Sequence, residues 1–195
     1  MKHLIVFAHP HTDSFNRAIL NTTVQALESN GHEVIVRDLY ELNFEPVLTS
    51  ADTAAMRAGQ TPEDIKAEQA YITAADVVTF IYPIWWTGLP AILKGYVDRV
   101  FAYGYAYAYE EAGIAKLLKG KQGLIINTHG TPKEVYDSIG MTDGLKITST
   151  TGIFDFVGIE SVDHLLFGGI GSLNEEAYAD ILNQIKNRVN TLFPQ

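Results

Sequence analysis

The 195-residue sequence predicts an α/β domain built on a doubly wound parallel sheet. Short apolar runs rich in Val, Ile and Leu alternate with longer amphipathic stretches, mostly through short connections. The apolar runs are continuous, which is typical of strands buried on both faces of a parallel sheet. No internal repeat and no linker rich in Pro, Gly or Ser divides the chain, so we expect one domain over residues 1–195.

Five apolar runs are the expected strands: 4–8, 33–37, 76–82, 123–128 and 159–167. Amphipathic patterns predict four helices, which run from Ser14 to a left-handed cap at Gly31, over about 62–74, over about 89–102 and over about 174–192. The second opens with Thr61-Pro62-Glu63-Asp64, a combination of N-cap, first-turn proline and acids that favours a helix start. The long connection 38–61 is expected to wrap the surface.

Composition excludes several classes of function. Fourteen Lys and Arg against 23 Asp and Glu give a net charge of −9, which argues against binding along a nucleic-acid duplex or an anionic membrane surface. No cysteine is present, so disulfides, thiolate catalysis and cysteine metal sites are excluded. The apolar run near the amino terminus is too short for a signal peptide or a membrane span. We therefore expect a cytoplasmic protein without membrane insertion.

In a doubly wound sheet, ligands bind outside the carboxyl ends of the strands, which directs attention to loops 9–16, 83–88 and 129–142. Loop 9–16 (HPHTDSFN) opens a helix whose N-cap is Ser14 or Asp13, and free backbone amides there would suit a phosphate. The loop contains neither GxxxxGK nor GxGxxG. A well-capped helix without any ligand explains the same residues.

Loop 83–88 (PIWWTG) carries both tryptophans of the chain. Pro83 ends the strand and Gly88 permits an unusual backbone turn, so exposed amides would stand beside large apolar rings. That combination suits a planar heterocycle with polar edges. The alternative is that the tryptophans cover the core or seal a subunit contact.

Loop 127–142 carries hydroxyls, His129 and Tyr136, which could stabilise an oxyanion or relay a proton beside a cofactor. A lone loop histidine is more often only a surface residue. His9 and His11 lack a third ligand and Ser14 lacks a GxSxG context, so we expect neither a metal site nor a catalytic triad.

Several motifs, in order, resemble the flavodoxin-like NAD(P)H:quinone oxidoreductases, the DT-diaphorase family: AHPHTDSFN, DLYELNFEPV, DIKAEQ, PIWWTGLPAILKGYVDRVF and YAYAY. The resemblance covers residues 4 to about 185. It implies a single flavodoxin-like domain with strand order 2-1-3-4-5, and a compact member of the family. It also implies a homodimer that binds a flavin and reduces quinones or similar aromatic acceptors with two electrons from NADH or NADPH, by a ping-pong scheme.

The resemblance also implies roles for individual residues. His9, Ser14, Phe15 and Asn16 would hold the phosphate side of the flavin, with Gln69 nearby. The flavin ring would lie along Pro83, Ile84, Trp85 and Trp86 and beside Thr128, His129 and Gly130. Tyr136 matches the active-site tyrosine of the family, with His129 beside it as a second catalytic candidate. Tyr107 and Tyr109 of a partner subunit, together with Trp86, would form the substrate pocket.

Departures from the family pattern leave specific points open. Thr142 stands where mammalian members have a histidine six residues after the tyrosine, and we hypothesise that His129 partly substitutes for it. Asp13 replaces a threonine of the phosphate loop. Tyr178 aligns near an arginine that supports the adenosine end of FAD, yet the 38–61 segment and Gln69 resemble FAD-binding members. FAD is slightly favoured over FMN.

The same resemblance admits other functions. Azo- or nitro-reductases use similar pockets for flat acceptors, and some short relatives are ancillary regulatory subunits of potassium-efflux antiporters. A one-electron carrier of the flavodoxin type is disfavoured because it needs no aromatic pocket of cofactor size.

Overall fold

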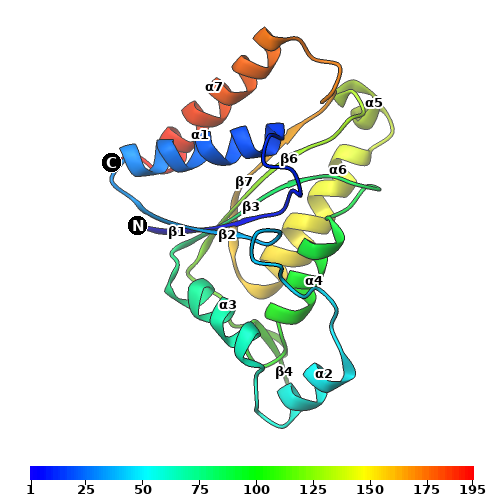
Figure 1. Ribbon diagram of the computed structural model, residues 1–195. Helices are drawn as coiled ribbons and strands as arrows, with labels where there is room; N and C mark the ends of the chain where they lie inside the picture. Colours follow the sequence, from blue (N-terminus) through cyan, green and yellow to red (C-terminus); the bar gives the residue numbers. More distant parts are fainter.

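A computed structural model describes residues 1–195 and shows a five-stranded parallel sheet between two layers of helices (Figure 1). The strands are β1 (Lys2–Phe7), β2 (Glu33–Asp38), β3 (Val77–Pro83), β6 (Gln122–Thr128) and β7 (Glu160–Phe167). Their order is β2-β1-β3-β6-β7, and every neighbouring pair is parallel. Counted within the sheet this is 2-1-3-4-5, so the predicted fold is confirmed.

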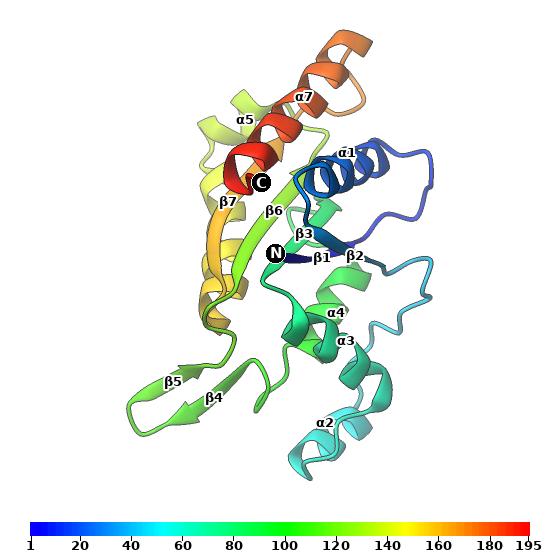
Figure 2. The same ribbon diagram turned by 90° about the vertical axis from the view of Figure 1, so that its left-hand side faces the viewer.

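Each face of the sheet is covered by its own set of helices. On one face, α1 (Phe15–Ser29) and α7 (Glu175–Leu192) pack against β1, β3 and β6 in an apolar cluster that includes Ile5, Ile19 and Ile185. The other face carries a larger cluster, in which α4 (Ala91–Val100) and the helical segment 141–157 are packed. The helix α3 (Glu63–Ala74) covers the same face beside them (Figure 2). The burial of both faces explains why the strands read as continuous apolar runs.

The structure contains helices that periodicity does not predict. The long connection includes α2 (Ser50–Arg57), and the expected loop 129–142 includes α5 (Lys133–Ser138) and the start of α6 (Met141–Lys146). A π-helix, η1 (Ile147–Asp155), continues α6. Its sequence ITSTTGIFD is rich in β-branched residues and contains a glycine, so local propensity disfavours a helix there. Packing of Phe154 and Ser149 into the interior favours it instead.

A two-stranded hairpin projects from the body of the molecule after α4 (Figure 2). It consists of the antiparallel strands β4 (Tyr107–Glu110) and β5 (Gly113–Lys116). The rings of Tyr103 and Tyr109 are stacked with centroids 5.8 Å apart, and Tyr107 meets both edge-on. The hairpin therefore carries a cluster of tyrosines away from the sheet.

The 38–61 connection wraps the surface as expected, and Arg99 of α4 holds it there. The buried guanidinium of Arg99 donates to the Glu45 carbonyl at 2.8 Å and to Asp64 at 2.7 Å, and its Nε lies 3.3 Å from an Asp52 oxygen. Gly95 lets the connection approach α4 closely, because a Cβ there would stand 2.1 Å from the Pro46 carbonyl oxygen. None of the helices is both long enough and apolar enough to cross a membrane.

Candidate active site at the carboxyl edge of the sheet

Three loops meet at the carboxyl ends of β1, β3 and β6, and hydrogen bonds join them. The side-chain amide of Asn16 donates to the Thr128 hydroxyl at 2.9 Å, and the backbone amide of Ile84 donates to the Thr128 carbonyl at 2.7 Å. The rings of His9 and Trp85 lie with centroids 6.0 Å apart. Residues 112 positions apart in sequence are thus brought to one place, as a doubly wound sheet predicts.

The first loop ends in a helix amino terminus with free donors. Ser14 is the N-cap of α1, and its Oγ accepts from the Arg17 amide at 3.2 Å. The amides of Phe15 and Asn16 have no helical partner because they lie in the first turn. A 15-residue helix therefore points its positive end and two amides at this loop, which suits a phosphate. Asp13 is exposed and leaves the capping to Ser14.

Asn16 carries a further sign of a missing partner. The residue is 4% exposed, and its Oδ1 is buried without any hydrogen-bond partner. A buried unsatisfied acceptor destabilises a protein by about 1–3 kcal/mol, so it is rarely retained without a role. The donor set and this orphaned atom fit a ligand that carries both a phosphate and hydroxyl groups.

The second loop is a tight turn with an uncommon backbone. Trp85 and Gly88 exchange two backbone hydrogen bonds, of 3.2 and 3.1 Å. The two central residues, Trp86 and Thr87, have φ angles of 50° and 57°. The unusual conformation expected of Gly88 thus falls on two residues that have side chains, as in a type I′ turn occupied by neither Gly nor Asn. Such residues cost of order 1–3 kcal/mol each, and strain of this kind concentrates at functional sites.

The two tryptophans differ in surroundings. Trp85 is 41% exposed and lies beside His9, whereas Trp86 is 100% exposed and packs against nothing in its own chain. The alternative that both rings cover the core is therefore excluded. Within one chain Trp86 also forms no wall of a pocket, so that expected role needs a ligand or a second subunit.

The third loop places His129 against Tyr136. The rings are stacked with centroids 4.4 Å apart and an interplanar angle of 16°. The His129 amide donates to the Phe167 carbonyl, and its own carbonyl accepts from Ile170. Both ring nitrogens of His129 are buried and make no hydrogen bond of good geometry, and burial, which outweighs the nearby Thr131 backbone, lowers the pKa of the imidazole below 6.5. His129 is therefore a buried neutral side chain and not a surface histidine.

Thr142 does not take part in this stack. Its hydroxyl donates to Asp137 at 2.6 Å, and Asp137 also pairs with Lys133. The Lys133 contact first, and then the Thr142 hydroxyl, lower the pKa of Asp137. Thr142 thus joins α5 to α6, and His129 is the only imidazole stacked on Tyr136. A Cβ on the neighbouring Gly130 would make an ordinary van der Waals contact of 3.8 Å with the Ile170 carbonyl oxygen.

A fourth loop, residues 168–173, closes the rim and is not predicted by the sequence. The Phe15 and Tyr178 rings meet edge-on at 4.6 Å, and the Tyr178 hydroxyl accepts from the Gly171 amide at 2.9 Å. A Cβ on Gly168 would stand 2.6 Å from His129 Cε1 and 2.8 Å from the Lys133 amide. The glycine cluster GGIG at the end of β7 is the signal that could have identified this loop.

Two groups of expected site residues lie elsewhere. Gln69 lies apart from the three loops of its own chain, and its side-chain amide donates to the Val100 carbonyl at 3.0 Å, where α3 meets the last turn of α4. That contact lies at the amino edge of the sheet, opposite the phosphate loop. Tyr107 and Tyr109 lie on the projecting hairpin, away from the candidate-site loops of the same chain. They line a cavity of about 450 Å³ together with Leu48 and Met56. No group of three or more His, Asp or Glu side chains is placed to hold a metal ion.

Comparisons with known proteins agree on one family. The family model described as "Flavodoxin-like fold" matches residues 1–189. The chain is 43% identical to an "Uncharacterized NAD(P)H oxidoreductase" of Haemophilus influenzae over 91% of this chain and 88% of that relative. It is 32% identical to the rat "NAD(P)H dehydrogenase [quinone] 1" over 98% and 77%, respectively. Among solved structures, the "NAD(P)H:quinone oxidoreductase from Methanothermobacter marburgensis" superposes with a TM-score of 0.91 at 31% identity, covering 98% of both chains.

Proposed function

Because the chain belongs to the flavodoxin-like family of NAD(P)H:quinone oxidoreductases, we propose that it is a flavoprotein that reduces quinones or similar aromatic acceptors with NAD(P)H. The observation that carries the proposal is the junction of three loops around Thr128, with partnerless buried atoms on Asn16 and His129. The reductant and the acceptor would use one pocket in turn, and the kinetics would be ping-pong.

The residues present fit a flavin. The amides of Phe15 and Asn16, the Ser14 hydroxyl and His9 would hold its phosphate at the start of α1. The segments Pro83–Trp86 and Thr128–Gly130 would flank the ring with backbone amides and apolar side chains. When bound, a flavin supplies two-electron redox chemistry, while the protein supplies binding, orientation and electrostatics.

His129 and Tyr136 are the proposed catalytic pair. A neutral imidazole and a phenol, held parallel, can each donate a hydrogen bond to negative charge that develops beside them. Burial keeps the imidazole uncharged near neutral pH, so it can donate one N–H and accept at the other nitrogen. This pairing would replace the histidine that the family has at the position of Thr142.

We further propose a homodimer in which the hairpin of one subunit completes the pocket of the other. Tyr109 is 67% exposed and Tyr103 57% although they stack on each other, and Trp86 is 100% exposed, so the hairpin and the turn both present large rings to solvent in one chain. Tyr107 and Tyr109 of the partner subunit would then face Trp86 across the acceptor. Exposed aromatic patches of this kind mark association surfaces.

FAD and FMN fit the proposal equally at the loops themselves. The sequence features that favour FAD make contacts within the chain. Gln69 bonds to the end of α4, and residues 45–46 pack on α4. The fluorescent cofactor released by heat, separated by chromatography, will distinguish them.

The test is direct. The purified protein should show flavin absorbance, and initial rates with NADH or NADPH and a benzoquinone should give parallel double-reciprocal lines as the second substrate varies. A protein that takes up neither FAD nor FMN would contradict the proposal. Turnover of an azo dye but not of any quinone would favour the azoreductase alternative, and the antiporter alternative predicts flavin binding with little turnover.

A further inference from the structure

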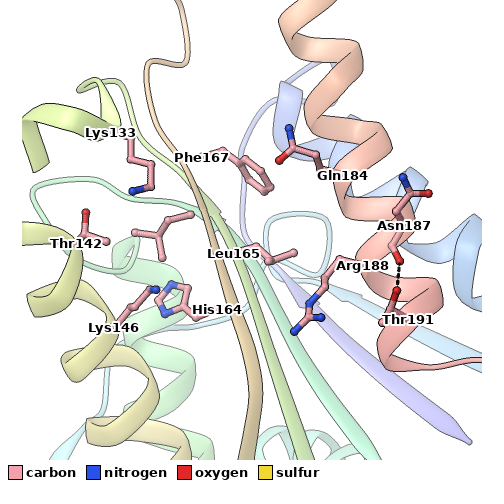
Figure 3. A pocket seen from close by; sticks show the side chains of 11 residues that line it. Lys133, Thr142, Lys146, His164, Leu165, Phe167, Gln184, Asn187, Arg188 and Thr191 are labelled. Carbon is pink, nitrogen blue, oxygen red and sulfur yellow. Dashed lines mark hydrogen bonds between the residues drawn. The ribbon is translucent and has the colours of Figure 1, made fainter. Parts of the chain in front are cut away.

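A groove of about 580 Å³ lies along the outer edge of the sheet, on the side away from the candidate active site's first loop (Figure 3). Its floor is the edge strand β7. One wall comes from α5 and α6 and carries Lys133 and Lys146, and the other comes from α7 and carries Arg188.

The charge of the groove is opposite to that of the molecule. Three basic side chains and no carboxylate line it, although the chain as a whole has a net charge of −9. Lys133 pairs with Asp137 on its own helix, and Arg188 Nε lies 2.5 Å from Asp163. Lys146 has no carboxylate within ion-pair distance. Lys146 is therefore the uncompensated positive charge of the groove, while Arg188 on the other wall is bound to Asp163 through its Nε.

The floor also offers unpaired backbone groups. The Phe167 carbonyl accepts from His129 on the β6 side, and alternate residues of a parallel strand turn their backbone groups to the same neighbour. The backbone N–H and C=O groups of Leu165 and Phe167 thus point to β6, whereas those of His164 and Leu166 point away from β6, into the groove. The His164 amide is occupied by Asp163 Oδ1 at 2.7 Å. The His164 carbonyl and both backbone groups of Leu166 have no strand beside them.

The open stretch of edge is short because both of its ends are closed. A β-bulge lies opposite Gly123 and Leu124, and Asp163 folds back over the edge there. At the other end Gly168 packs against the 131–133 loop. Bulges and covered ends are the devices by which proteins block unwanted strand pairing. The stretch from His164 to Phe167 is the part that these devices leave accessible.

A second sign of a missing partner lies at the same place. His164 is 7% exposed and lines the groove, and its Nδ1 has no hydrogen-bond partner, while Nε2 lies 3.1 Å from the Asn127 amide oxygen.

We propose that this groove binds a short, extended, acidic segment of a partner protein, which pairs with β7 as an added sixth strand. Main-chain hydrogen bonds to Leu166 and His164 would supply affinity. Successive side chains of a strand point to opposite faces, so two adjacent acidic residues would reach Lys146 on one wall and Arg188 on the other. Strand pairing explains the open backbone groups, and the acidic preference explains the basic walls.

The probe is a fluorescently labelled, capped peptide of sequence Val-Glu-Glu-Val-Glu, titrated with the flavin-loaded 195-residue chain at low ionic strength. Fluorescence anisotropy measures binding, and amide hydrogen exchange followed by NMR measures protection of Leu166. We expect saturable binding, slower exchange at Leu166, and affinity that falls as salt is added. Lys146→Glu should weaken binding by about tenfold or more. Lys186→Glu, an equal charge change at an exposed α7 position outside the groove lining, should change it little.

Three outcomes would overturn the proposal. Absence of saturable binding at low ionic strength would show that the groove takes no such segment. Equal binding of the same peptide with alternate amides N-methylated, or unchanged exchange at Leu166, would show charge attraction without strand pairing. Displacement of the peptide by millimolar inorganic phosphate, with Leu166 protected by phosphate alone, would assign the groove to a small anion. None of these results depends on quinone turnover.

Discussion

His129 links the geometry of the site to its proposed chemistry. Its ring is buried, stacked on Tyr136 and without hydrogen-bond partners of good geometry, so its nitrogens are available to a ligand. We predict that His129→Ala slows hydride transfer from NAD(P)H by about 10²-fold, in the range that one positioned proton donor contributes. Flavin affinity should change only slightly, because backbone groups hold the ring. Stopped-flow reduction and flavin titration measure the two quantities, and equal losses in both would contradict a catalytic role.

Gly168 determines how closely the fourth loop approaches the third. A Cβ at this position would meet His129 Cε1 at 2.6 Å and the Thr131 carbonyl oxygen at 2.8 Å, and the second of these is backbone that cannot rotate away. Gly168→Ala should therefore destabilise the protein by about 1–3 kcal/mol, a typical cost of overpacking, and displace the His129 ring. Urea unfolding measures the stability, and the hydride-transfer rate measures the displacement.

The matched control for that substitution is Gly144→Ala in α6, where a Cβ would meet nothing within 4 Å. Alanine favours the helix over glycine by about 1 kcal/mol, so this variant should be as stable as the parent or more so. Similar losses in both variants would show that the effect does not come from contact with His129.

At the scale of elements, Arg99 connects α4 to the long surface segment that contains α2. The same guanidinium contacts Asp52, Asp64 and the Glu45 carbonyl, and its contact with Asp52 helps to lower the pKa of that acid, after the backbone bond from Thr49. We predict that Arg99→Met destabilises the protein by about 1–3 kcal/mol, because the Asp52 carboxylate and the Glu45 carbonyl each lose a donor, while Asp52 keeps its bond from the Thr49 amide. Chemical denaturation measures the change.

The comparison variant is Asp64→Asn, which removes a half-exposed partner of the same arginine. It should cost less than about 1 kcal/mol, as is usual for exposed ion pairs. A larger loss of stability in Asp64→Asn than in Arg99→Met would show that Arg99 is not the residue on which this network depends.

The elements that the sequence predicts are those whose pattern agrees with their packing. All five sheet strands and the helices α1, α3, α4 and α7 lie within a few residues of their expected bounds, because buried parallel strands and two-sided helices leave clear periodic patterns. The segment 133–158 has no such pattern. Its α5, α6 and η1 helices are short, polar or rich in Thr and Gly, and Leu145 of α6 and Phe154 of η1 hold the last two against the larger apolar cluster on one face of the sheet.

The candidate site divides in the same way. Residues on loops that directly follow β1, β3 and β6 meet as expected, because topology alone places those loops together. Gln69 lies apart from these loops in its own chain, because a helix motif does not reveal which end of the sheet its middle reaches, and its expected role at the flavin stays a prediction. The strain at Trp86 and Thr87 could not be predicted, because a left-handed conformation is expected at the adjacent Gly88, which has no side chain.

For the whole molecule, buried histidines contribute to the response to acid, and His3 and His164 have the most strongly lowered pKa values. Burial, reinforced by nearby His32 and the amino terminus, lowers the pKa of His3 to about 4, and burial with nearby Lys146 lowers the pKa of His164 to about 4. In the unfolded chain both rings titrate near 6.5. Between these values the unfolded state binds protons that the folded state does not, so stability should fall as pH drops from about 6.5 to about 4.

His3→Phe tests this response, because phenylalanine fills the same space against Phe193 and cannot take up a proton. The free energy of unfolding, measured by urea titration at several pH values, should depend less steeply on pH across that window than in the parent. His11→Phe at an exposed position is the control and should leave the slope as it is. An identical slope in all three proteins would show that His3 does not contribute to acid sensitivity.

The turn at Trp85 and Trp86 also gives the molecule an intrinsic fluorescent probe of the candidate site. Both indoles of the chain lie on this one turn, so tryptophan emission comes from the rim of the candidate site and from nowhere else. One indole is fully hydrated and the other is partly covered by His9. Their emission maximum and intensity therefore report directly on whatever arrives at that rim, whether an acceptor molecule or a second subunit, and no dye or added chromophore is required.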